Sequence, residues 1–156
     1  MADITPQGNN SVISELDIRI WMRDVDPTLN LLIDDLEFSP EEIRTAMTLA
    51  VDKWNDTPPF LTSHNYNISN FPFRSGLLSG TCANLFFIAA NRYRRNSLKY
   101  NVPGGAVADQ EKYVEYDQAG QRLWTDYVNW MRLTKRSINI EHGFASFGGI
   151  APRAWR

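Results

Sequence analysis

The sequence contains very little cysteine and histidine, and this scarcity excludes several kinds of site. Among its 156 residues there are one cysteine, Cys82, and two histidines, His64 and His142. A lone cysteine cannot close a disulfide within the chain, and zinc sites take about four clustered Cys, His or acidic ligands. We therefore expect no internal disulfide and no metal, in a chain that folds in a reducing compartment.

The sequence also has no long apolar run. No stretch approaches the roughly 18 apolar residues that span a bilayer. Residues 1–6 show no basic region followed by an apolar run, the pattern of a secretory signal peptide. We expect neither a membrane span nor a leader.

Motifs for catalysis or nucleotide binding are missing as well. Gly76 to Gly80 reads G-x-x-S-G, which is not the G-x-S-x-G of a hydrolase, and no predicted strand precedes it. Pro103-Gly104-Gly105 lacks the Lys and Ser/Thr of a phosphate-binding loop. The two histidines lie in separate predicted loops. The sequence therefore predicts a chain that is not an enzyme and takes no cofactor.

What the sequence does contain is helical periodicity. Ser39, Pro40 and Glu42 form a helix-start signal, because Ser caps, Pro favours the first position and Glu completes a capping box. Apolar residues then recur at spacings of three and four: Ile43, Ala46, Met47, Ala50, Val51 and Trp54. This spacing predicts a helix with one buried face.

Three other segments favour helices: residues 14–23, residues 75–100 and residues 109–135. The middle one is apolar on most sides, which indicates a central, buried helix. With 43% hydrophobic and 22% charged residues, the composition is that of one globular domain. We predict an all-α fold, a small helical bundle over residues 1–136 that includes an extended N-terminal segment, followed by an extended C-terminal arm over residues 137–156.

Charge is unevenly distributed along the chain. Residues 1–59 hold twelve acids and four bases, a net charge of −8, whereas residues 60–156 hold six acids and twelve bases, a net charge of +6. This asymmetry suits head-to-tail contact between copies or contact with a charged partner. Packing of the two halves within one fold explains it equally well.

Three groups of residues are candidates for contact with partners. The first is a basic cluster, interpreted as subunit-contacting or channel-facing: Arg92, Arg94, Arg95 and Lys99. The second is an acidic cluster without the spacing of a calcium loop, interpreted as partner-facing: Asp34, Asp35 and Glu37. The third lies in the predicted arm, which is too rich in aromatic residues for a free arm: Phe144, Phe147, Ile150, Arg153, Trp155 and Arg156.

The layout of the chain over about residues 14–156 resembles the head-to-tail connector, or neck adaptor, proteins of tailed bacteriophages. The resemblance lies in Ser39-Pro40-Glu41-Glu42-Ile43, in Val51 to Pro59, in the long apolar helix from about Arg74 with its basic end, and in the aromatic last helix. It implies a virion protein assembled in the host cytoplasm and located at the head–tail junction.

The resemblance also implies partners. These are the portal protein and neighbouring neck or tail proteins, with further copies forming a ring of twelve, DNA passing through without sequence-specific contact, and no membrane. The arm would then dock into the portal. The alternatives are a phage tail or baseplate structural protein, or a regulatory module that binds nucleic acid through the basic cluster.

Overall fold

The computed structural model describes residues 13–29, 35–61, 65–95, 101–102, 105–106 and 112–148. Its helices are α1 (Glu15–Met22), a short 3-10 helix η1 (Pro27–Leu29), α2 (Pro40–Asp56), α3 (Arg74–Arg95) and α4 (Lys112–Gly148). Two-residue strands β1 (Asn101–Val102) and β2 (Gly105–Ala106) pair antiparallel. The prediction of an all-α helical bundle is confirmed.

Helices α1 and α2 begin at the capping residues that the sequence predicts. At α2, the Ser39 hydroxyl accepts a hydrogen bond from the Glu42 backbone N–H (3.2 Å), and the Glu42 carboxylate accepts one from the Ser39 backbone N–H (2.9 Å). Ser14 and Asp17 form the same reciprocal box at α1. Each such cap contributes about 1 kcal/mol, so both helix starts are specified locally.

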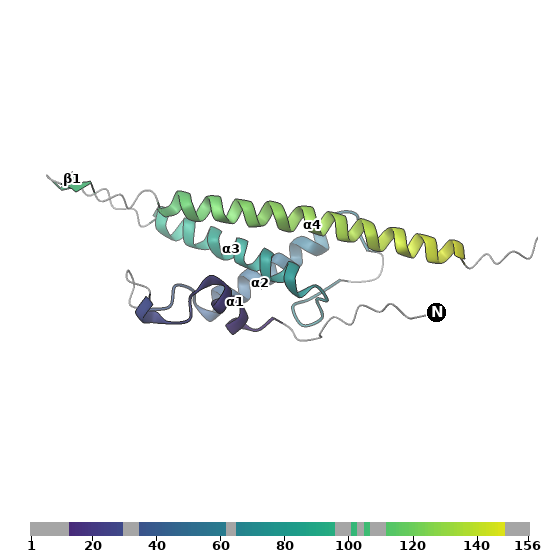
Figure 1. Cartoon of the computed structure of the whole chain (residues 1–156), viewed down its shortest axis with the longest axis horizontal. Coiled ribbons are helices and arrows are strands. Elements are labelled where there is room, and N and C mark those ends of the chain that lie inside the picture. The colour runs from purple at the N-terminus through teal and green to yellow at the C-terminus, as the bar shows by residue number, and fades with distance from the viewer. Residues whose placement is uncertain are drawn as a thin grey trace, which may run out of the picture.

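Helix α3 is the centre of the bundle. It packs against both α2 and α4, and Figure 1 shows α4 along one side of α3 with α1 and α2 on the other. Glycines permit this close packing. A Cβ built on Gly76 meets the Trp130 ring at 2.1 Å, and one built on Gly80 meets the Ala50 Cβ at 3.0 Å. The predicted central position of this helix is confirmed.

Aromatic side chains attach the connection between α2 and α3 to the core. Trp54 contacts the rings of Phe71 (5.3 Å between centroids) and Phe73 (5.1 Å). The Asn55 side chain both donates to and accepts from the backbone of Tyr66. This segment therefore forms part of the core although its described residues contain no helix or strand.

The prediction of an extended arm from residue 137 is wrong as far as residue 148, because α4 continues to Gly148. The sequence loses its apolar period after Lys135 because the helix runs past the N-terminal end of α3, where no other described helix lies beside it (Figure 1). Periodicity reports burial, and a helix without a buried face keeps its backbone hydrogen bonds. Residues 149–156, and the predicted helix start at Asp109, lie outside the described residues.

Among the residues that the structure describes, no helix is both long enough and apolar enough to cross a membrane.

Candidate interaction surfaces

One residue of the acidic cluster, Glu37, and one of the basic cluster, Arg92, contact each other at a half-buried position. The Glu37 carboxylate accepts hydrogen bonds from the hydroxyls of Tyr93 (3.0 Å) and Tyr116 (3.1 Å). Arg92 donates to the Glu37 carbonyl oxygen (2.6 Å) and to the Glu42 carboxylate (2.5 Å). Burial, and then the charge of Glu37, raises the pKa of both tyrosines above their ordinary value.

Glu37 and Arg92 therefore connect α3 and α4 to the start of α2. That Glu37 faces a partner, and that Arg92 contacts another subunit or faces a channel, stay predictions. Sequence reasoning misses the contact because Glu37 and Arg92 are 55 residues apart. The Arg74–Asp17 ion pair (2.9 Å) likewise joins the basic half to the acidic half. Part of the charge asymmetry is thus satisfied within one copy.

The remaining members of the two clusters are less enclosed. Asp35 is exposed, and its carboxylate accepts a hydrogen bond from the Leu36 backbone N–H (2.7 Å). Arg94 and Arg95 are exposed, with the Arg94 guanidinium 5.4 Å from the centre of the Tyr113 ring. Asp34 and Lys99 lie outside the described residues.

Helix α1 exposes three large apolar side chains: Leu16, Ile20 and Trp21. Leu16 and Ile20 lie one turn apart on one side, which we call the α1 face, and Trp21 lies about 100° round the helix from Ile20. Their exposed fractions are 57%, 59% and 47%. The opposite side of α1 is fixed by Ile18 and by the buried Arg19, whose guanidinium donates to the Asp24 carboxylate (2.9 Å) and to the Phe38 carbonyl oxygen (2.9 Å). The α1 face is therefore held in one orientation.

A second exposed apolar face lies on the last part of α4, residues 133–148, which we call the α4 tail; it begins beside α2 at Lys135 and continues past the N-terminal end of α3 (Figure 1). With 1.5 Å per residue, the 22-residue α3 is about 33 Å long and the 37-residue α4 about 55 Å. Leu133 is 66% exposed and Ile140 is 56% exposed. Because they are seven residues apart, they lie two turns apart on one face.

Lys135 anchors α4 where the tail begins. It is 1% exposed, and its ammonium group donates to the carbonyl oxygens of Trp54 and Thr57 at the end of α2. The ammonium also lies 5.1 Å from the centre of the Trp54 ring, a favourable cation–π contact. Burial lowers the pKa of Lys135, and the charge of Asp56 opposes that shift. Sequence reasoning missed this residue.

The predicted arm residues divide between two regions. Phe144 and Phe147 lie in the helical backbone of α4. Ile150, Arg153, Trp155 and Arg156 lie outside the described residues.

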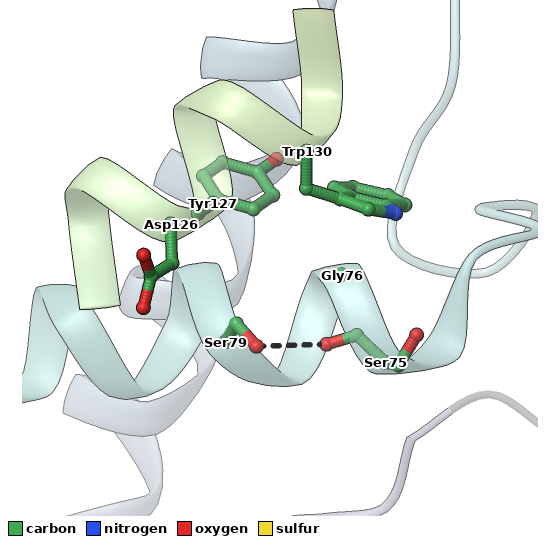
Figure 2. A pocket seen from close by; sticks show the side chains of 6 residues that line it. All are labelled: Ser75, Gly76, Ser79, Asp126, Tyr127 and Trp130. Atoms are coloured by element: carbon green, nitrogen blue, oxygen red, sulfur yellow. Dashed lines mark hydrogen bonds between the residues drawn. The ribbon is translucent and has the colours of Figure 1, made fainter. Parts of the chain in front are cut away.

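A pocket of about 220 Å³ lies between α3 and α4 (Figure 2). Its lining residues are Ser75, Gly76, Ser79, Asp126, Tyr127 and Trp130. The Ser79 hydroxyl donates to the Ser75 carbonyl oxygen (3.1 Å), and the Tyr127 hydroxyl donates into the core, to the Ala50 carbonyl oxygen (2.7 Å). No histidine or lysine is among the lining residues to act as a base toward either serine.

Within the described part of the chain, no group of three or more His, Cys, Asp or Glu side chains is placed to hold a metal ion. The chain matches no protein-family model, no curated protein and no solved structure.

Proposed function

We propose that this chain is a virion structural protein of a tailed phage, a subunit of an adaptor ring that lies below the portal at the head–tail junction and lines the DNA channel. The observation that carries the proposal is the α4 tail. It extends past the bundle as a helix, exposes Leu133 and Ile140, and is anchored at its base by Lys135.

A tail of this kind suits docking into a preformed ring. Ordering a flexible arm on binding costs conformational entropy, whereas an arm that is already helical has paid most of that cost in folding. Each fully buried leucine or isoleucine side chain contributes about 1.5–3 kcal/mol. Leu133 and Ile140 together therefore supply a substantial apolar contact if the portal covers them.

Exposed arginines fit the same proposal. Arg94 and Arg95 lie in the last turn of α3. Figure 1 shows this C-terminal end of α3 at the opposite end of the bundle from the α4 tail. Guanidinium groups attract phosphates without reading base sequence, which suits DNA that passes through a channel. A ring with its tails toward the portal would leave this end of the bundle available to DNA or to the next neck protein.

The test is mass photometry of the purified chain with a candidate portal ring. We expect a discrete complex with the full chain and its loss when residues 137–156 are deleted. The matched control is Leu49→Glu, since Leu49 is 47% exposed but lies on α2, away from the tail. A deletion variant that binds the portal as tightly as the full chain would refute the assignment of the tail.

Two other functions predict different results in related assays. A tail or baseplate component would not bind the portal ring and would bind tail structures instead. A nucleic-acid-binding regulator would bind DNA with an affinity that falls steeply with salt and weakens on Arg95→Glu, without forming a large assembly.

A further inference from the structure

One flank of α4 carries a line of exposed polar side chains, which we call the polar stripe. Its members recur at spacings of three and four residues, which places them along one side of the helix: Gln118, Arg122, Thr125, Asn129 and Arg132. With a rise of 1.5 Å per residue, the polar stripe is about 21 Å long. It ends just before the α4 tail begins, so it shares no residue with the part of α4 that the proposed function assigns to the portal.

The two arginines of the polar stripe have no carboxylate partner in the part of the chain that the structure describes. Arg19, Arg74 and Arg92 each form an ion pair with a carboxylate elsewhere in the fold. Among the described residues, neither Arg122 nor Arg132 does so. Their guanidinium groups are therefore available to an anion outside the chain.

The described carboxylates of α4 lie off the polar stripe. Asp117 and Asp126 each adjoin a stripe residue in the sequence, so each lies about 100° round the helix from that residue. Asp117 is half-buried, and Asp126 lines the pocket between α4 and α3 (Figure 2). Glu115 comes before the polar stripe and Glu141 after it. The stripe thus presents positive charge with no carboxylate in its own line.

A groove of about 520 Å³ between the polar stripe and the end of α2 adds a third cation. Lys53 lines it, and its ammonium group lies 5.9 Å from the centre of the Trp124 ring, which also lines the groove. Asp56 is a lining residue too, and its charge favours the nearby buried ammonium of Lys135. With Lys53 and Arg132 against Asp56, the lining residues carry a net charge of +1.

We propose that the polar stripe, together with Lys53, binds the phosphates of double-stranded DNA without reading its sequence. This inference deepens the proposed function and rests on it for the DNA of the channel. In DNA complexes, phosphate oxygens accept hydrogen bonds from arginine, lysine, threonine, asparagine and glutamine side chains, and the proposed site consists of these types alone. Arg122 and Arg132 are ten residues apart, about 15 Å, which spans about four phosphates of one strand along the DNA axis.

The composition of the polar stripe favours DNA over a protein partner. The centre of a protein interface is depleted in charge and enriched in aromatic side chains. From residue 115 to residue 132, α4 exposes no large apolar side chain, in contrast to the α1 face and the α4 tail. Helix α1, which carries two acids in its first turn, lies on the other side of α3 from α4 (Figure 1). The stripe is therefore set apart from those carboxylates.

The test is fluorescence anisotropy of a labelled duplex of about 30 base pairs, titrated with the full chain up to about 200 µM at about 50 to 200 mM NaCl. Two duplexes of unrelated sequence should bind equally. The double variant Arg122→Gln/Arg132→Gln should bind at least tenfold more weakly at the lowest salt. Its plot of log affinity against log salt should be shallower by about 1.8, because each lost phosphate contact lowers the slope by about 0.9.

The matched control is Arg23→Gln/Arg44→Gln, which removes the same charge from exposed positions outside α4. Arg44 lies nine residues before Lys53 and so on the opposite side of α2 from it. Circular dichroism checks that both double variants fold, and the control should bind DNA as the wild type does. Equal affinities and slopes for the two double variants would overturn the proposal, as would a wild type that does not bind DNA at the lowest salt.

Two other outcomes would assign the site differently and also overturn the proposal. Loss of DNA binding in Arg94→Gln/Arg95→Gln, with none in the stripe variant, would place the DNA at the end of α3. Loss of self-association in the stripe variant, with DNA binding unchanged, would assign the stripe to an acidic surface of a second copy. Portal binding of the same samples tests the proposed function separately, because a chain that binds DNA through the stripe but does not bind the portal refutes only the adaptor role.

Discussion

Replacing Lys135 with methionine should destabilise the fold by about 1–3 kcal/mol. The variant keeps most of the apolar stem but removes the donor to the carbonyl oxygens of Trp54 and Thr57. The Trp54 carbonyl keeps a hydrogen bond from the Thr57 backbone N–H (3.4 Å), so the main loss is at the Thr57 carbonyl, and a buried carbonyl left without a partner costs about 1–3 kcal/mol. The favourable interaction of the ammonium with the C-terminal end of α2 adds about 0.3–1 kcal/mol. Burying the ammonium itself costs free energy, and the methionine variant avoids this cost, which offsets part of the loss of stability.

The same substitution should alter how stability depends on pH. Because the pKa of Lys135 is lowered in the folded state from 10.5, the unfolded chain binds more protons between the two values. In that window the stability contributed by Lys135 rises with pH, since the cost of burying its charge disappears as the amine loses its proton. A neutral amine still has two N–H groups to donate. The difference in stability between wild type and Lys135→Met should therefore grow from pH 7 toward pH 10.5.

Urea denaturation followed by circular dichroism measures both effects, with Arg136→Met as the control because Arg136 is the exposed neighbour of Lys135. Arg136→Met should lie within about 0.5 kcal/mol of the wild type. A Lys135→Met midpoint equal to that of the control would refute the argument that the ammonium satisfies the end of α2. A difference that shrinks as the pH rises would refute the sign of the linkage.

Two further substitutions test the packing of α4 on the rest of the fold. Gly76→Ala places a Cβ 2.1 Å from the Trp130 ring, so the ring must move. The free energy of unfolding should fall by about 1–3 kcal/mol, measured by thermal denaturation. An unchanged midpoint would contradict the close approach. Glu37→Gln removes the charge that, after burial, raises the pKa of Tyr93 and Tyr116 above 10.0 in the folded state. Stability falls as pH rises above 10 because the unfolded tyrosines ionise first, and denaturation at pH 9, 10 and 11 should show a shallower fall in the variant than in the wild type.

The parts of the fold that could be predicted from the sequence are those set by neighbouring residues. The box of Ser39 and Glu42 fixes the start of α2 over three residues, and the apolar spacing from Ile43 to Trp54 identifies its buried side. Both signals are local. The cap and the apolar spacing can be recognised in the sequence because the first turn of a helix needs a cap and a helix repeats every 3.6 residues.

The parts that could not be predicted depend on contacts between distant residues. Lys135 meets residues about 80 positions earlier, so its role as an anchor has no local signature. Helix α4 ends later than its apolar spacing predicts, because the loss of periodicity marks the loss of a buried face and not the end of the helix. The α1 face had a visible signal, since Leu16 and Ile20 are four residues apart, but a short helix gives too few residues to separate its buried side from its exposed side.

The position of Lys135 has a mechanical consequence. Because the buried Lys135 side chain joins α4 to the end of α2, a force applied to the tail passes into the final turn of α2. A pull along the axis of α4 slides it past α3, and Trp130, seated against Gly76, obstructs that sliding. A force on the tail is therefore transmitted to the core of the bundle through these contacts.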